Sequence, residues 1–354
     1  MVNQLFSPLK LREVVFRNRI FVSPMCQYSA VDGVPNDWHM VHLGSRAVGG
    51  AALVIAEATA VSPEGRISPD DTGLWDHQQM TAFEKIAAFI TSEGAIPGIQ
   101  LAHAGRKASM SSPWNGGKLV QPDKGGWDVV APSAIAYSEE YAMPHALSIQ
   151  EIDTLVQKFT DSTTRAARAG FKVIEIHMAH GYLLHEFLSP LTNQREDAYG
   201  GSLERRMKLP LRVACAVRET FPASLPVFVR ISATDWAEGG WNLEQSVIFC
   251  RELRKIGIDL IDCSSGGQVS YAKVPVGPGY QVPFAAAIRR ETGIATGAVG
   301  MITKAQQAED ILENGEADVI FLGREMLRDP YWPLHAAREH GVDIPWPAQY
   351  LRAK

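Results

Sequence analysis

The chain has 354 residues, 46% of them hydrophobic and 21% charged, so it is long enough to bury a full core. Its formal net charge of −5 includes no long run of one sign, which argues against nucleic acid or an anionic membrane as the main partner. The four cysteines form neither a CxxC pair nor a metal-ligand spacing, and they suit free thiols in a reducing compartment. The first residues lack the apolar core of a signal peptide, and no apolar run is long enough to span a bilayer. We therefore expect a soluble, cytoplasmic protein.

Eight short apolar segments predict buried strands, because each is about half a dozen residues long and is bounded by glycines or polar residues. In chain order they are residues 20–24, 52–58, 96–101, the run that starts at 173, and residues 227–231, 260–264, 294–298 and 318–322.

Amphipathic helices precede or follow these strands, and their ends carry recognisable signals. Helix 149–169 is the clearest, because Ser148 and Glu151 form a capping box at its start and Gly170 suits the left-handed position after its end. Two further helices are predicted from the same signals, one from Asn242 and Gln245 to Gly257, the other from Thr303 and Gln306 to Gly315. A last helical segment is expected near 331–340.

Alternation of strand and helix predicts a parallel sheet with helices outside it. A doubly wound open sheet is the rival arrangement, but eight units in one chain favour a closed (β/α)8 TIM barrel, an α/β fold. We predict one barrel domain over residues 1–340. Residues 104–147, rich in proline, glycine and tryptophan, form a long insertion after the third strand, and such a length is typical of a lid. Residues 341–354 are predicted to be an irregular, extended tail.

Polar side chains gather where the predicted strands end, which is where a parallel barrel displays its chemistry. The fourth strand ends in His177, His180 and Tyr182. Glycine-rich backbone after the seventh and eighth strands, backed by Arg324, is typical of a phosphate site. With Gln100 and Arg230 at other strand ends, this predicts a flat heterocycle across the barrel mouth. An unpaired Arg230 would be costly, so an anionic partner is expected for it.

Two other interpretations of the histidines are weaker. Metal ligands usually stand at i, i+4 on a helix or as HxH on a strand, and no carboxylate accompanies His177 and His180 at the HExxH spacing. Plain packing seldom collects two histidines and a tyrosine at one strand end. We therefore expect no metal.

The strand-end residues stand in motifs that resemble the Old Yellow Enzyme family of FMN-dependent ene-reductases. The resemblance covers almost the whole chain and is carried by SPMCQY, EATAVSPEGR, GIQLAHAGRK, IEIHMAHGYLLHEFLSPLTNQREDAYGGSLERR, ATGAVG and FLGRE. The SPMC form and the short chain are similar to the thermophilic-like branch of the family, which includes xenobiotic reductase A.

The resemblance implies roles for particular residues. The implied FMN contacts are Ser23, Pro24, Met25, Cys26, Ala58, Gln100, Arg230, Ser264, Val299, Gly300, Gly323 and Arg324. The implied catalytic residues are His177, His180 and Tyr182, and the two histidines would also bind substrate together with Tyr28 and Arg352. Arg352 matches an arginine that this branch lends to a neighbouring active site, which implies a homodimer or a homotetramer. A cysteine such as Cys26 is by itself more often an inert buried thiol, and only its place in SPMC at a strand end favours a flavin contact as strongly. Tyr28 could equally be a rim residue, and without the resemblance Arg352 is a solvated tail residue.

The resemblance also implies the reaction. NADPH or NADH would reduce FMN, and an α,β-unsaturated carbonyl compound would then be reduced at its activated C=C bond, with nitro compounds and other xenobiotic electrophiles as further substrates. A metal-dependent or Schiff-base barrel is a different hypothesis, but it needs a carboxylate-rich set or a lysine at the strand ends. A barrel that binds flavin without turnover is a third.

Overall fold

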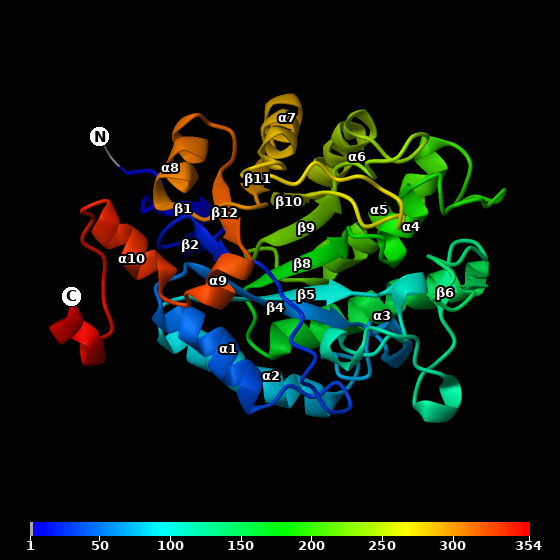
Figure 1. The fold of residues 1–354 in the computed structure, drawn as a ribbon, viewed down its shortest axis with the longest axis horizontal. Helices are drawn as coiled ribbons and strands as arrows, with labels where there is room; N and C mark the ends of the chain where they lie inside the picture. Colours follow the sequence, from blue (N-terminus) through cyan, green and yellow to red (C-terminus); the bar gives the residue numbers. More distant parts are fainter. Residues whose placement is uncertain (1–2) are drawn as a thin grey trace.

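Eight parallel strands close into a barrel in the computed structural model, which describes residues 3–354 (Figure 1). The closure is made by β12 and β3, which pair with Ile320 opposite Ile20. The barrel confirms the predicted closed sheet over the open one. Its strands are β3 (Ile20–Val22), β4 (Leu53–Ala60), β5 (Ile96–Ala102), β8 (Val173–Met178), β9 (Val227–Ser232), β10 (Leu260–Ser264), β11 (Ala295–Ala298) and β12 (Val319–Leu322).

Helices surround the barrel, and the predicted capping residues Ser148 and Asn242 cap two of them, α3 and α6. The Ser148 hydroxyl accepts a hydrogen bond from the Glu151 amide, the Glu151 carboxylate accepts one from the Ser148 amide, and Gly170 has a φ of 89°. These contacts confirm the capping box and the glycine end of α3. The helices are α1 (Asp37–Val48), α2 (His77–Ser92), α3 (Ile149–Arg168), α4 (Leu183–Leu188), α5 (Leu203–Thr220), α6 (Leu243–Ile256), α7 (Val282–Thr292), α8 (Ala305–Glu313), α9 (Arg324–Arg328) and α10 (Trp332–Glu339).

The predicted start of α8 is wrong. The residue before its first turn is Lys304, and no side chain caps the helix, so the pair Thr303 and Gln306 forms no cap. The Thr303 carbonyl instead accepts a hydrogen bond from the Trp332 indole at 3.2 Å, which keeps Thr303 in the loop. The glycine signal at the other end holds, because Gly315 has a φ of 67°.

An antiparallel hairpin, β1 (Leu9–Leu11) and β2 (Val14–Phe16), precedes the barrel and was not predicted. Its Phe16 packs at the amino ends of the strands, with its ring centroid 4.8 Å from that of Phe21 and 6.4 Å from that of Phe228. All three rings are fully buried. The hairpin therefore closes the end of the barrel opposite to the predicted site. Burying one such side chain stabilises the fold by about 1.5–3 kcal/mol.

The insertion between β5 and α3 holds three short 3-10 helices, η2 (Gly105–Lys107), η3 (Pro113–Asn115) and η4 (Pro122–Lys124), and a two-residue pairing of β6 (Val130–Ala131) with β7 (His145–Ala146). Figure 1 shows the insertion beyond the tip of β5. It therefore stands at the carboxyl-end side of the barrel.

The tail differs from the predicted extended segment. Residues 341–347 are irregular, but Ala348–Ala353 form a 3-10 helix, η5, because the alanine, glutamine, leucine and arginine after Pro347 favour helix. Figure 1 shows this segment beside α10 and away from the barrel. Within residues 3–354, no helix is long and apolar enough to cross a membrane.

Candidate active site

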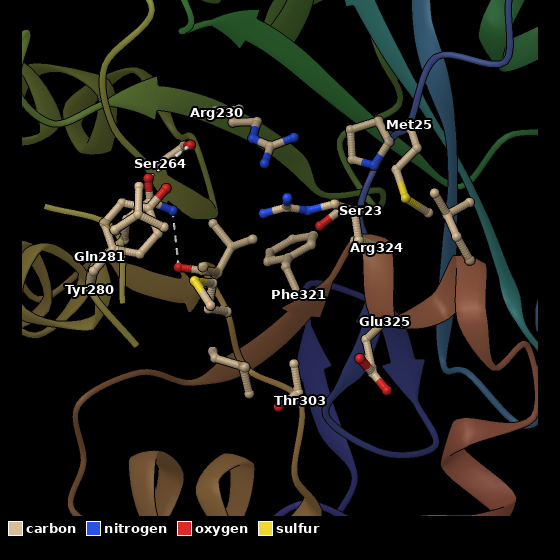
Figure 2. Close-up of a pocket in the computed structure, with 18 of the residues that line it drawn as sticks. Ser23, Met25, Arg230, Ser264, Tyr280, Gln281, Thr303, Phe321, Arg324 and Glu325 are labelled. Atoms are coloured by element: carbon tan, nitrogen blue, oxygen red, sulfur yellow. Dashed lines mark hydrogen bonds between the residues drawn. The ribbon is translucent and has the colours of Figure 1, made fainter. Parts of the chain in front are cut away.

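A cavity of about 670 Å³ opens at the carboxyl ends of β3, β9, β10, β11 and β12 (Figure 2). Cavities of this size are typical of small-molecule and cofactor sites. Figure 2 shows the guanidinium groups of Arg230 and Arg324 facing the same space. The predicted cofactor contacts that line the cavity are Ser23, Pro24, Met25, Arg230, Ser264, Val299, Gly300, Gly323 and Arg324.

Three predicted cofactor contacts do not line this cavity. Ala58 lines another, smaller void, which Tyr182 also lines. Gln100 is buried inside the barrel, where its amide nitrogen donates to the Glu175 carboxylate at 2.7 Å. Cys26 lies between Met25 and Tyr28, and its burial, followed by the nearby Asp71 and Glu57, raises its pKa well above its ordinary value. The thiol therefore stays protonated, which makes it a poor nucleophile.

Arg230 is not unpaired, so the reason given for expecting an external anionic partner is wrong. Its Nε lies 3.0 Å from the Asp262 carboxylate, which is fully buried on the neighbouring strand β10. The pairing of β9 with β10 places Arg230 opposite Asp262 and causes this contact. The guanidinium still reaches the cavity, so it can face a bound group while Asp262 holds it from behind.

The histidines and the tyrosine at the end of β8 form one cluster, as predicted. The ring centroid of His177 lies 5.1 Å from that of His180 and 4.9 Å from that of Tyr182, and both pairs are nearly perpendicular. The His177 Nδ1 accepts a hydrogen bond from the Ala179 amide at 3.2 Å. In the neutral ring the proton therefore sits on Nε2, which is left as a donor.

His180 is held by two contacts with neighbouring strands. Its backbone amide donates to the Ser232 hydroxyl at 2.9 Å, and its Nε2 lies 2.7 Å from the Ser264 hydroxyl. Its φ of 60° is uncommon for a residue other than glycine, and these contacts hold it there. His180 thereby connects the predicted catalytic cluster with the cavity, which Ser264 lines.

Burial decides the charge state of this cluster. It lowers the pKa values of His177 and His180 well below 6.5, and the positive charge of Arg230 lowers them further. Both rings are therefore neutral near pH 7. Burial also raises the pKa of Tyr182 well above 10, so its hydroxyl keeps its proton. Near pH 7 the site therefore offers neutral histidines as hydrogen-bond donors beside a protonated tyrosine, which can act as a general acid but not as a general base.

The comparisons with known proteins decide the family. The model of the NADH:flavin oxidoreductase / NADH oxidase family matches residues 4–341. The chain belongs to this family. It is the Old Yellow Enzyme family, and membership makes the chain a flavin-dependent NAD(P)H oxidoreductase.

Relatives and solved structures of the family agree with this assignment. The chain is 47% identical to an NADPH dehydrogenase of Geobacillus thermodenitrificans over 98% of each chain, and 45% identical to one of Bacillus subtilis over 99% of each. Among solved structures, morphinone reductase matches with a TM-score of 0.81 and 27% identity over 97% of this chain and 91% of its own. The Old Yellow Enzyme homologue from Zymomonas mobilis matches with a TM-score of 0.79 and 25% identity, over 97% and 94%. The fold of this chain is thus the fold of other members of its family.

Some residues of the site were missed from the sequence. The ammonium of Lys107 donates to the carbonyls of His180, at 2.8 Å, and Gly267, and burial lowers its pKa to about 7. The Gln281 amide donates to the Val299 carbonyl at 3.0 Å and lines the cavity (Figure 2). Lys107 is the last residue of the GIQLAHAGRK motif, so the sequence did contain a signal for it. Gln281 lies outside the motifs that carry the resemblance, and no signal in the sequence pointed to it.

The two predicted substrate contacts outside the β8 cluster differ in position. Tyr28 does not line the cavity, and its ring centroid lies 5.7 Å from that of Trp114 in the insertion. Arg352 is exposed on η5 and does not line the cavity of its own chain.

Proposed function

We propose that this oxidoreductase binds one non-covalent FMN in the cavity and reduces the activated C=C bond of α,β-unsaturated carbonyl compounds with NADPH or NADH. The observation that carries the proposal is the position of Arg230 and Arg324, two guanidinium groups that face one cavity, with the neutral His177 and His180 at the end of the strand next to that of Arg230. Cations suit a phosphate and a ring that gains negative charge, and neutral donors suit a carbonyl oxygen.

The residues present fit FMN. The Ser23 hydroxyl is buried without a hydrogen-bond partner, as a polar atom that awaits a ligand would be, and the Arg230 guanidinium reaches the cavity while its Nε is paired with Asp262. Arg324 would hold the phosphate as a bidentate fork, and the backbone at Gly300 and Gly323 would add amide donors. When bound, the flavin supplies the hydride chemistry, and the protein supplies orientation and electrostatics.

The substrate carbonyl would be held by His177 and His180. The His177 Nε2 is free to donate, because its Nδ1 is occupied by the Ala179 amide. The Ser264 hydroxyl lies 2.7 Å from the His180 Nε2 and 3.3 Å from the Gln281 Oε1; when it donates to the nearer nitrogen, the proton of the ring lies on Nδ1, which would be the second donor. The two donors would stabilise the enolate-like charge that develops on the carbonyl oxygen.

Tyr182 would protonate the α-carbon as the general acid. Its ring stands against His177 at 4.9 Å, so a substrate bound by the histidines lies within its reach. Its raised pKa keeps the proton in place until carbanionic character develops.

The tail would complete the site of a second subunit. Tyr350 and Leu351 are exposed by 39% and 55%, so two apolar side chains of the tail are available to a neighbouring chain. We propose a homodimer, or a homotetramer built from it, in which Arg352 enters the neighbouring site. Deleting residues 349–354 should weaken substrate binding and loosen the dimer in sedimentation; a fully active monomer contradicts this part of the proposal.

The cofactor part is tested by releasing the cofactor with acid. FMN at one per chain is expected, and FAD alone or metal alone contradicts the proposal. Arg324→Ala should weaken FMN binding by about 10- to 100-fold, since a charged hydrogen bond contributes about 1.5–3 kcal/mol. Arg290→Ala, on the exposed face of α7, is the control and should retain FMN.

A further inference from the structure

Inside the barrel, Gln100, Glu175, Arg230 and Asp262 form a polar layer next to the cavity. They come from the adjacent strands β5, β8, β9 and β10, and strand register places Gln100 opposite Glu175 and Arg230 opposite Asp262. Glu175 and Asp262 stand two residues before His177 and Ser264, so they point to the same face one step deeper in the barrel. Both carboxyl groups are fully buried.

The layer contains more carboxylates than cations. Asp262 faces the Arg230 Nε at 3.0 Å but accepts no hydrogen bond, and Glu175 accepts one from Gln100 and leaves Oε2 unpartnered. One guanidinium compensates one carboxylate, and a second buried charge would be costly. Burial, followed by repulsion from Asp262, raises the pKa of Glu175 to about 8, and burial raises that of Asp262 to about 6. The two groups therefore share a proton near neutral pH.

Among residues 3–354, no further titratable group compensates the charge of this layer. His177 and His180, which lie nearer the carboxyl ends of the strands, are neutral, and Lys107 donates to the His180 carbonyl rather than to the layer. Glu57 of β4 is turned to His39, at 3.1 Å. Strands β3, β11 and β12 carry no titratable residue, and Arg324, whose guanidinium faces the cavity with that of Arg230 (Figure 2), does not contribute to the pKa shifts of Glu175 or Asp262.

We propose that Glu175 and Asp262 are positioning residues that set the reduction potential of the flavin through Arg230 and take up a proton when the flavin is reduced. The inference rests on the proposed function, because it needs FMN in the cavity. Arg230 is the link, since it touches both the carboxyl layer and the cavity.

The charges balance as follows. A hydride from NAD(P)H carries two electrons and one proton to the flavin, which leaves one added negative charge beside Arg230. The positive charge of Arg230 is already balanced by the one negative charge of the Glu175–Asp262 pair. A second proton from solvent therefore binds this pair and restores neutrality. When hydride passes to the β-carbon of the substrate, that proton returns to solvent.

The test is the midpoint potential of the FMN holoenzyme, measured by spectroelectrochemistry from pH 6 to pH 9. For a two-electron couple each proton taken up contributes about 30 mV per pH unit. The slope should approach about 60 mV per pH unit where the pair titrates. It should fall to about 30 mV in Glu175→Gln/Asp262→Asn. Asp262→Asn alone should shift the equilibrium toward reduced flavin by about tenfold or more, since the charge of Arg230 is then less compensated.

Asp259→Asn is the matched control. Asp259 also pairs with an arginine, Arg12, but it precedes β10 at the opposite end of the barrel, so the slope should remain that of the natural enzyme. The absorbance of the reduced flavin shows whether its own ring takes up the second proton. A steep slope with a protonated reduced ring, or an unchanged slope in both Glu175→Gln and Asp262→Asn, overturns the inference. In either case FMN binding and enone reduction still support the proposed function, whereas a chain without FMN contradicts that function itself.

Discussion

The His180 Nε2 and the Ser264 Oγ lie 2.7 Å apart and join the ends of β8 and β10. The contact connects two elements that are 84 residues apart in the chain, and it fixes the orientation of the His180 ring. Ser264 lines the cavity, so one hydroxyl stands between the proposed substrate site and the proposed cofactor site.

Ser264→Ala should slow reduction of enones by roughly 3- to 10-fold while FMN remains bound. The loss corresponds to one hydrogen bond of about 0.5–1.5 kcal/mol, because the His180 ring keeps its position but loses its fixed tautomer. Single-turnover kinetics with prereduced enzyme measures it. An unchanged rate would show that the contact does not orient the ring.

His177→Ala or His180→Ala should slow the same half-reaction by about 10²–10³-fold each, as expected for the loss of one donor to a developing oxyanion. FMN content and the reduction of FMN by NADPH should change much less. His145→Ala is the control, since the exposed side chain of His145 lies in the insertion and pairs with Glu151, and neither residue lines the cavity. Equal rates in the double variant and the natural enzyme would refute the assigned role.

Tyr182→Phe should slow enone reduction but spare quinones, which need no proton at carbon. Because its pKa is raised, Tyr182 should also cause no loss of rate as the pH rises from 7 to 9. Parallel turnover of 2-cyclohexenone and a quinone provides the comparison. A loss of the same size with both substrates would contradict a role as general acid.

Glu175→Gln should change how stability depends on pH. Glu175 binds its proton more tightly in the folded chain, so its stabilisation is complete below its ordinary pKa of 4.5 and is lost as the pH rises through about 8. The free energy of unfolding of Glu175→Gln, relative to the natural chain, should therefore rise between pH 5 and pH 8. Urea unfolding at several pH values measures it. Glu84→Gln, at an exposed position on α2, is the control, and a flat difference for Glu175→Gln contradicts the buried shared proton.

The barrel could be predicted because its signals are local. The capping box at Ser148 and the left-handed glycines at 170 and 257 mark helix ends in the sequence, and each apolar run between them is one strand. The hairpin at Leu9–Leu11 and Val14–Phe16 could not, since three residues carry no measurable alternation. The prediction of an extended tail was wrong, because Pro345 and Pro347 do not prevent a helical turn in the residues that follow them.

The ionic layer could not be predicted because it depends on strand register. Arg230 and Asp262 are 32 residues apart, and only the pairing of β9 with β10 brings them within 3.0 Å. Glu175 was a missed signal, since a carboxylate in the middle of an apolar strand is rare unless it is paired. The β8 cluster was found because its three members lie within six residues of each other.

The central claim, hydride transfer through a flavin to an enone, is tested most directly by one anaerobic titration. Purified holoprotein is bleached with one equivalent of NADPH and then mixed with 2-cyclohexenone, while the flavin absorbance is followed. We expect the oxidised spectrum to return within one turnover, with one equivalent of cyclohexanone formed. A flavin that stays reduced in the presence of the enone, or a protein without flavin, would contradict the account.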